Sequence, residues 1–189
     1  MLTEKQILLL KTIGKLNCLD KDSLKHFGFG KKIVKKLISE KLICKTKLSC
    51  SYIPTLYILT KKGRVIFKNI TEEKISRSRS LKHDYYHTKN ILSYLSLDNI
   101  NSYQNERYIR NKYKEEIKTL EDKGYHISCP DCCLVVDDKL VYIETMIDYV
   151  KPRLQAKKNF TLLDKNMELI VFRKNNRLVY HYKGGDTLC

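Results

Sequence analysis

The chain has 189 residues and a formal net charge of +16, from 37 Lys and Arg against 21 Asp and Glu. Its 42% apolar content, with 7 glycines and 3 prolines, is typical of a globular protein and excludes a disordered one. No apolar run approaches the roughly 18 residues of a membrane span, and the N-terminus lacks the apolar core of a signal peptide. Seven cysteines, an odd number, without an export signal predict reduced thiols, a cytoplasmic location and no membrane partner.

The positive charge is concentrated in the N-terminal part of the chain. Residues 1–80 carry 19 Lys and Arg against 6 Asp and Glu, whereas residues 81–189 carry 18 against 15. This asymmetry predicts that the N-terminal part alone binds a polyanion. A membrane surface is the weaker interpretation, because the chain has no Trp and few Phe to insert beside the basic residues.

The first residues predict two helices and a tight connection. Thr3 with Gln6 three positions later forms a capping-box pattern, followed by an apolar stripe at helical spacing. A turn over 17–22 and a short helix over 23–27 come next, and two glycines flank Phe29 before the following helix. This order is that of a helix-turn-helix, whose last helix enters the major groove of DNA.

The segment 29–43 is the most informative stretch of this part. At 100° per residue, its apolar side chains fall on one side of a helix and four lysines fall on the other: Lys31, Lys32, Lys35 and Lys36. A charge run on a helix is most often a solvated face. The helices before it and the hairpin after it favour a DNA-binding face.

Two strands, over 42–48 and 55–59, predict a hairpin, and Thr60 caps a further helix over 61–67. The run Tyr57-Ile-Leu-Thr-Lys-Lys-Gly-Arg64 resembles the wing-to-helix junction of bacterial winged-helix DNA-binding proteins, where a YxLTxxGR pattern is frequent. The resemblance implies a winged helix-turn-helix whose DNA contacts are Lys31, Lys32, Lys35, Lys36, Ser39, Lys45, Lys47, Lys61 and Arg64.

The type of each side chain indicates whether it contacts phosphates or base edges. Lysines are point charges suited to phosphates, and base edges are left to Lys32, Lys36 and Ser39. Arg64 is the only arginine before Arg77, so planar groups that read guanine are scarce. The sequence predicts binding more firmly than specificity.

A polar stretch over 71–80 predicts a linker between a domain at 1–70 and a second domain at 81–189. The second begins with a helix over 81–97, in which His83 and His87 are four residues apart. Without an HExxH context, we interpret both as satisfied or solvated histidines. A strand over 102–110 that carries Glu106, and a helix over 112–122, are expected next.

Two β-rich runs flank Asp137-Asp138, a candidate for a two-residue turn. If the turn is right, Asp131 faces Glu144 across the hairpin, with Cβ atoms about 5 Å apart. Two opposed carboxylates repel, so the arrangement predicts a bound cation or a raised pKa. The sequence leaves both open.

Here the chain resembles the PD-(D/E)XK nuclease-like fold, with a further helix over 150–164 and a strand over 167–173. Taken whole, the chain is similar to the replication-relaxation family of plasmid and mobile-element proteins, on short motifs: His83, NER at 105–107, PD at 130–131 and YIE at 142–144. The resemblance implies a site of Glu106, Asp131 and Glu144 that holds Mg²⁺, with Asp131 and Glu144 as metal ligands. Met146 stands where active nucleases carry a lysine, and Lys151 is the nearby substitute.

A zinc site is an alternative use of the cysteines. His126, Cys129 and Cys132, with Cys133 adjacent, have the spacing of half a zinc site. The other half would come from Cys44, Cys50 or Cys189, which are remote in sequence and have no matching pair. We favour buried cysteines that act as small apolar residues.

Together these patterns predict an α+β protein: a winged helix-turn-helix, then a small α/β nuclease-like domain with a mixed sheet. The expected function is sequence-specific binding of double-stranded DNA in plasmid or mobile-element replication, mobilisation or transcriptional control. No cofactor is expected. The alternatives are a Mg²⁺-dependent DNA endonuclease using Glu106, Asp131, Glu144 and Lys151, and a scaffold that forms a homodimer through its C-terminal domain.

Overall fold

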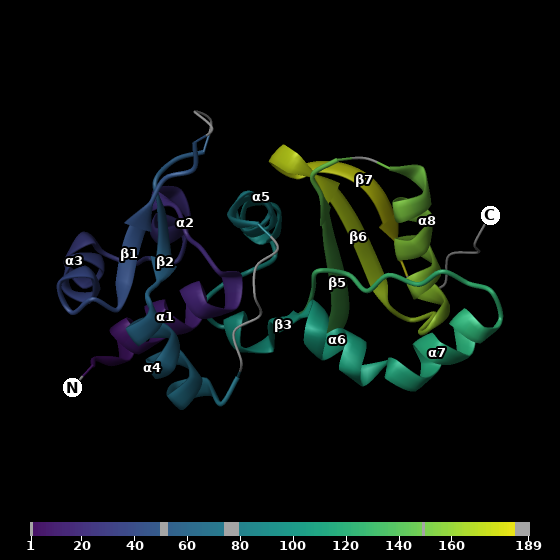
Figure 1. Cartoon of the computed structure of the whole chain (residues 1–189), viewed down its shortest axis with the longest axis horizontal. Coiled ribbons are helices and arrows are strands. Elements are labelled where there is room, and N and C mark those ends of the chain that lie inside the picture. Colours follow the sequence, from purple (N-terminus) through teal and green to yellow (C-terminus); the bar gives the residue numbers. More distant parts are fainter. Residues whose placement is uncertain (1, 50–52, 74–79, 149, 184–189) are drawn as a thin grey trace. The chain divides into compact units, whose positions relative to one another are not determined.

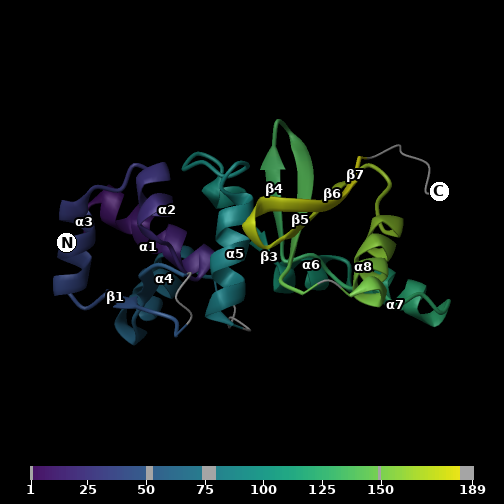
Figure 2. The same cartoon turned by 90° about the horizontal axis from the view of Figure 1, so that it is seen from above.

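Helices and a two-stranded hairpin form the first part of the chain, and a five-stranded mixed sheet with helices forms the second (Figures 1 and 2). A computed structural model describes residues 2–49, 53–73, 80–148 and 150–183. It divides into two units, Met1–Leu92 and Ser93–Cys189. None of the described helices is long and apolar enough to cross a membrane.

The first unit follows the predicted order of elements. It comprises α1 (Glu4–Leu16), α2 (Lys21–His26), α3 (Lys31–Ser39), β1 (Ile43–Thr46), β2 (Leu56–Leu59), α4 (Lys61–Thr71) and α5 (Leu81–Ile91). The capping box is confirmed, because Thr3 Oγ1 accepts from the Gln6 N–H and Gln6 Oε1 accepts from the Thr3 N–H. The Thr60 cap is confirmed as well, by a 3.1 Å hydrogen bond from the Gly63 N–H.

The core of this unit lies between α1, α3, α4 and the hairpin. Its fully buried side chains include Leu10, Ile13, Leu37 and Phe67. Leu19 forms an isolated antiparallel bridge with Tyr57, which adds a short third segment to the β1–β2 pair. Part of the predicted loop between the strands, residues 50–52, lies outside the described residues.

Helix α5 belongs to the first unit, which differs from the predicted division into 1–70, a linker over 71–80 and 81–189. Thr88 Oγ1 donates to the Cys18 carbonyl at 3.3 Å, and Lys89 Nζ lies 3.0 Å from Asp20 Oδ2. Leu81, Tyr85 and Tyr86 of α5 also pack against a buried cluster of the first unit. The apolar spacing of the helix does not indicate which partner it packs against, so the sequence pattern missed these contacts. Helix α4 continues to Thr71, and residues 74–79 of the predicted linker lie outside the described part of the chain.

The second unit is built on the strand order β3-β4-β5-β6-β7. The β5–β6 pair is parallel and the other pairs are antiparallel, so the predicted mixed sheet is confirmed. Its main elements are β3 (Gln104–Asn105), α6 (Glu106–Lys112), α7 (Lys114–Asp122), β4 (Cys132–Val136), β5 (Lys139–Met146), α8 (Lys151–Lys158), β6 (Glu168–Arg173) and β7 (Arg177–Tyr182).

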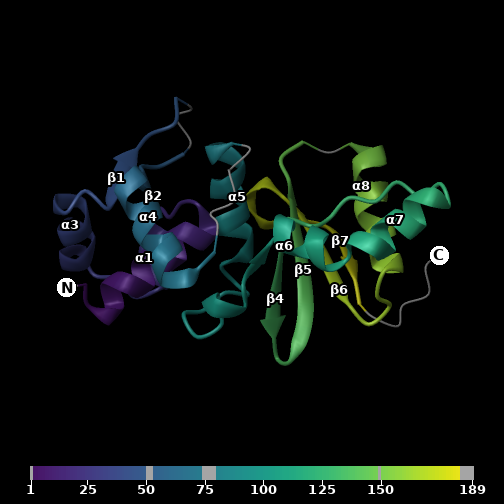
Figure 3. The ribbon, with the colours of Figure 1, turned by 60° about the horizontal axis from the view of Figure 1, so that its bottom comes forward.

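The β4–β5 hairpin has the predicted turn and register (Figure 3). Asp137 and Asp138 have φ values of 48° and 61°, as a two-residue hairpin turn of type I′ requires. Val136 pairs with Lys139, and Cys132 pairs with Ile143. Asp131 therefore lies one residue beyond the paired region, at the level of Glu144.

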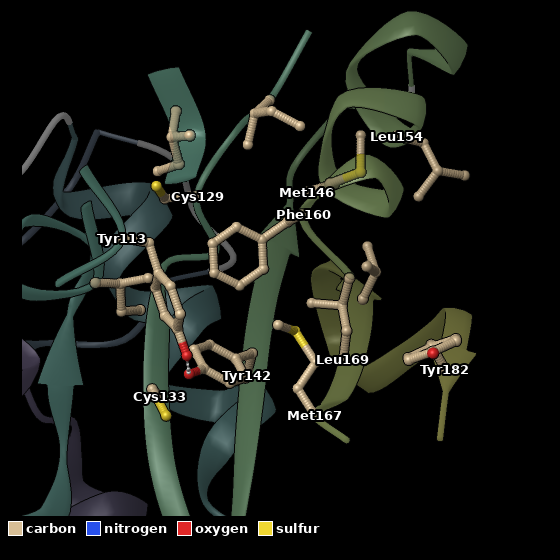
Figure 4. Close-up of a cluster of buried hydrophobic side chains, with 14 residues drawn as sticks. Tyr113, Cys129, Cys133, Tyr142, Met146, Leu154, Phe160, Met167, Leu169 and Tyr182 are labelled. Carbon is tan, nitrogen blue, oxygen red and sulfur yellow. Dashed lines mark hydrogen bonds between the residues drawn. The ribbon is translucent and has the colours of Figure 1, made fainter. Parts of the chain in front are cut away.

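One face of the sheet packs under α6, α7 and α8. Figure 4 shows buried side chains of this core. Tyr113, Tyr142 and Phe160 form its centre, with ring centroids 5.3 to 6.4 Å apart. The two tyrosine hydroxyls lie 2.8 Å apart in a buried hydrogen bond, so neither polar atom is left unsatisfied in the core. Alternation along β5 places Tyr142, Glu144 and Met146 on this same face.

The predicted strand over 102–110 is wrong. Only Gln104 and Asn105 are extended, and Glu106 is the first residue of α6. Asn105 accepts a hydrogen bond from the Tyr108 N–H at 3.1 Å, so a side-chain cap starts a helix where apolar and aromatic content had indicated a strand. Strand β7 was not predicted.

Gly63 tests the packing of α4 against the segment between α3 and β1. A Cβ added there would lie 2.0 Å from the Leu42 carbonyl oxygen, a backbone atom that cannot move away easily. We expect Gly63→Ala to lower the free energy of unfolding by at least about 2 kcal/mol. Asn69→Ala, at an exposed position of the same helix, should change it by less than about 0.5 kcal/mol in urea unfolding. Equal effects of the two variants would contradict this packing.

Candidate functional site

Helix α3 separates an apolar side from a cationic side, as predicted. Val34 is 7% exposed and Leu37 is fully buried, which anchors the helix on the unit. The lysines on the other side, Lys31, Lys32, Lys35 and Lys36, are all exposed. Lys36 lies 3.2 Å from Glu40, and within the described part of the chain no acid pairs with the other three. The face therefore presents several uncompensated positive charges to solvent.

The N-terminus of α3 lacks the side-chain cap that α1, α2, α4, α5 and α6 have. Gly30 occupies the cap position, and no acidic residue follows in the first turn. Lys31 and Lys32 stand there instead, at the positive end of the helix dipole, where a cation is unfavourable. Free backbone N–H groups, the dipole and two lysines together favour an anion at this end.

The remaining sequence-predicted DNA contacts also lie in the first unit and are exposed: Ser39, Lys45, Lys47, Lys61 and Arg64. A hollow of about 520 Å³ is lined by Lys35, Ser39, Lys45 and Thr60, so the end of α3, β1 and the start of α4 adjoin one another. The Ser39 hydroxyl donates to the Lys36 carbonyl at 2.7 Å, which commits its proton to the helix. Figure 1 shows α3 beside the hairpin.

The second unit holds a buried carboxylate on the helix-covered face of its sheet. Glu144 is fully buried, and its Oε2 lies 2.8 Å from Nζ of Lys157, which is 2% exposed. Arg153 lies 3.8 Å from Oε1. Lys157 also donates to the Cys129 carbonyl. Asp131 accepts the Thr145 N–H at 2.8 Å, one residue along β5 from Glu144.

Burial and, after it, the negative charge of Asp131 raise the pKa of Glu144 to about 7, while Lys157 and Arg153 oppose the rise. Asp131 and Glu144 thus interact as the hairpin register indicated. A raised pKa is one of the two outcomes that the sequence left open.

Lys151, the lysine expected near the acids, is exposed at the start of α8, and Lys157 contacts Glu144 instead. One signal could have identified Lys157: it lies three positions after the buried Leu154, and residues three apart share one side of a helix. Glu106 lies 3.1 Å from Arg110. Among the residues that the structure describes, no three His, Cys, Asp or Glu side chains are placed to hold a metal ion, so the three acids do not gather into such a group.

The cysteines that the structure describes in the second unit are buried thiols. Cys129, Cys132 and Cys133 are at most 1% exposed, and burial raises the pKa of each, that of Cys133 to about 11. A protonated thiol is a poor metal ligand and a poor nucleophile. His126 is exposed. The other half of a zinc site would come from Cys44, Cys50 or Cys189. Of these, Cys50 and Cys189 lie outside the described residues.

The two histidines of α5 lie against each other. The rings of His83 and His87 stack with centroids 6.1 Å apart, and His87 is 5% exposed. Both engage in further interactions with the protein. This agrees with the interpretation of the pair as satisfied side chains of the fold.

The raised pKa of Glu144 makes the stability of the chain depend on pH. The folded state holds a proton up to about pH 7 that the unfolded state releases near 4.5, so this contribution is full below 4.5 and is lost as pH rises through 7. We expect urea unfolding to show a stability loss between about pH 5 and about pH 8. Gln is a neutral isostere of the protonated carboxyl that the folded state holds below about pH 7, so Glu144→Gln should lose this slope. An unchanged slope in that variant would assign the titration to another group.

The structure thus gathers the predicted lysines on α3 and its neighbours in the first unit. It brings the predicted acids Asp131 and Glu144 into interaction and pairs Glu144 with a lysine that was not predicted. No protein-family model, curated protein or solved structure matches the chain.

Proposed function

We propose that the chain binds double-stranded DNA, with the first unit as a winged helix-turn-helix. In this proposal α3 is the recognition helix and the β1–β2 hairpin is the wing. The order α1-α2-α3-β1-β2-α4, the Leu19–Tyr57 bridge and the exposed cationic side of α3 support it. The excess of positive charge in residues 1–80 supports the same unit as the one that meets a polyanion.

The observation that carries the proposal is the uncapped, lysine-bearing N-terminus of α3. Like charges four residues apart repel, and cations at this end of a helix oppose its dipole. Both effects are unfavourable for α3, and in the described part of the chain no acid forms an ion pair with Lys31 or Lys32. A row of duplex phosphates would turn each unfavourable interaction into a favourable one.

In this proposal, few side chains are available to contact the edges of the DNA bases. Lys32 extends from α3 without an ion pair to a described residue, Lys36 is shared with Glu40, and the Ser39 proton is committed to the helix. Much of the affinity then comes from phosphates, and target choice depends on a small number of contacts. Work on plasmid or mobile-element DNA, in replication, mobilisation or transcriptional control, is the biological role that the sequence motifs suggest.

The test is the affinity of the full chain for a fluorescein-labelled duplex, measured by anisotropy at several salt concentrations. Replacing Lys32 and Lys36 by Ala should weaken binding by at least about tenfold. The slope of the logarithm of the binding constant against the logarithm of the salt concentration, called the salt slope below, should also decrease. It should fall in magnitude by about one for each phosphate that the variant no longer neutralises. Both lysines are exposed, so the fold should be retained.

Lys112 and Lys114 provide the matched control, because they too are exposed lysines but lie in the second unit. Their replacement by Ala should change neither the affinity nor the salt slope. An equal loss of affinity from the two pairs would show that charge alone, and not the α3 face, drives binding.

Metal-dependent cleavage of DNA is a second candidate function, favoured by one observation. Lys157 reaches the buried Glu144, and Asp131 acts on the same carboxylate, so two acids and a lysine are close together in the second unit. Carboxylate oxygens suit Mg²⁺, and a lysine can offset charge at a phosphate. Against cleavage, both Glu144 oxygens already face cations, and the third acid, Glu106, is paired with Arg110.

Incubation of the full chain with supercoiled and linear DNA in Mg²⁺ or Mn²⁺ decides between the two functions. We expect binding without cutting, because a metal ion would have to displace Arg153 from Glu144. Cutting that disappears in Asp131→Ala, Glu144→Ala and Lys157→Met, each shown to be folded by circular dichroism, would make the chain a nuclease. Lys151→Met is the matched control, since Lys151 is exposed and should leave any cutting unchanged.

A further inference from the structure

A hollow of about 700 Å³ lies beside α3 in the first unit, between α2, the turn before α3 and the hairpin. Its size falls in the range of small-molecule sites, roughly 300 to 1,000 Å³. Three apolar side chains contribute to its lining from recessed positions: Leu24, Phe29 and Val34 are 5%, 8% and 7% exposed. Half-buried Ile38 and Tyr57 add further apolar surface.

The charge around this hollow is mostly of one sign. Five lysines from three different elements line it: Lys21, Lys25, Lys31, Lys35 and Lys45. Asp22 is the one acid in the lining, and its carboxylate lies 3.7 Å from Lys89 Nζ, so part of its charge is already offset. Lysine ammonium groups on long stems can bend toward a bound anion while their methylenes cover its apolar part.

A DNA duplex accounts for the lysines but not for the recessed apolar surface. Phosphates and base edges meet side chains that project from the protein, such as Lys32. Leu24, Phe29 and Val34 lie deeper than such contacts reach. A hollow whose lining combines apolar side chains with five lysines is complementary to a molecule with an apolar body and an anionic group.

We propose that this hollow binds an amphipathic organic anion, an aromatic or aliphatic body that carries a carboxylate, sulfonate or phosphate, and that the bound anion competes with DNA. The competition rests on the proposed DNA-binding function, whereas the binding of the anion does not. Lys31 and Lys35 line the hollow and also belong to the cationic side of α3. An anion that engages them lowers the positive potential available to phosphates.

The probe for the test is anilinonaphthalene sulfonate, an aromatic anion whose fluorescence rises in an apolar site. The full chain should bind it saturably at one site, in the absence of DNA. N-phenylnaphthylamine, its neutral counterpart, should bind at least about tenfold more weakly, because it lacks the charge that the lysines meet. Amide shifts in a nitrogen–proton correlation spectrum should concentrate between residues 21 and 45 and leave the spectrum dispersed, which excludes a loosened chain as the binder.

Charge reversal then locates the site. Lys21→Glu with Lys25→Glu, on α2, should weaken probe binding by about tenfold or more, whereas Lys118→Glu, at an exposed position of α7, should leave it unchanged. Added duplex DNA should displace the probe. Failure to saturate, equal binding of the neutral compound, or equal losses from both charge reversals would overturn the site. If the probe binds saturably but DNA does not displace it, the competition is wrong and the anion site still holds. If the chain binds the probe but no DNA, the proposed DNA-binding function is wrong and the anion site still holds.

Discussion

Repulsion among the lysines of α3 is the constraint around which the first unit is organised. Lys31 and Lys35, like Lys32 and Lys36, are four residues apart on one side of a helix, so their charges oppose helix formation. The helix also begins without a side-chain cap. What holds it is the burial of Val34 and Leu37, with α1, the hairpin and α4 packed around the same core. Most helix stability in proteins comes from such packing, and here packing offsets the repulsion among the lysines on the exposed side.

Charged side chains on α3 are exposed in the first unit, whereas charged side chains are buried in a cluster in the second. The first exposes cations and leaves most of those on α3 without a described partner, which suits a surface that exchanges counterions for phosphates. The second buries Glu144 and surrounds it with Lys157, Arg153 and the charge of Asp131. Removing one partner of such a buried pair is costly, so the cluster ties α8 to β5 whether or not it has a further role. The pH dependence of stability and the proposed DNA affinity therefore belong to different parts of the chain.

Local patterns predicted much of this fold, and contacts between distant segments account for what they missed. The capping box at Thr3, the cap at Thr60 and the turn at Asp137-Asp138 depend on neighbours in sequence, and the structure has all three. The turn also set the register that brings Asp131 to Glu144. The strand expected around Glu106 is a helix, because the Asn105 cap outweighs β-forming side chains. Lys157 was missed because its partner is on a strand reached only through the tertiary fold. The contacts that join α5 to the first unit also link segments far apart in sequence.

Helix α7 provides an internal control for the proposal that the lysine-bearing N-terminus of α3 binds DNA phosphates. Helices α3 and α7 both have 9 residues and no side-chain cap, but α7 carries Glu115 and Glu116 in its first turn, where α3 carries lysines. The decisive measurement is a titration of isotope-labelled full-length protein with a short duplex, followed by backbone amide shifts. We expect the largest shifts at the first residues of α3, shifts that fade as salt is added, and none at the start of α7. Equal shifts at both helices, or shifts confined to the second unit, would contradict the proposal.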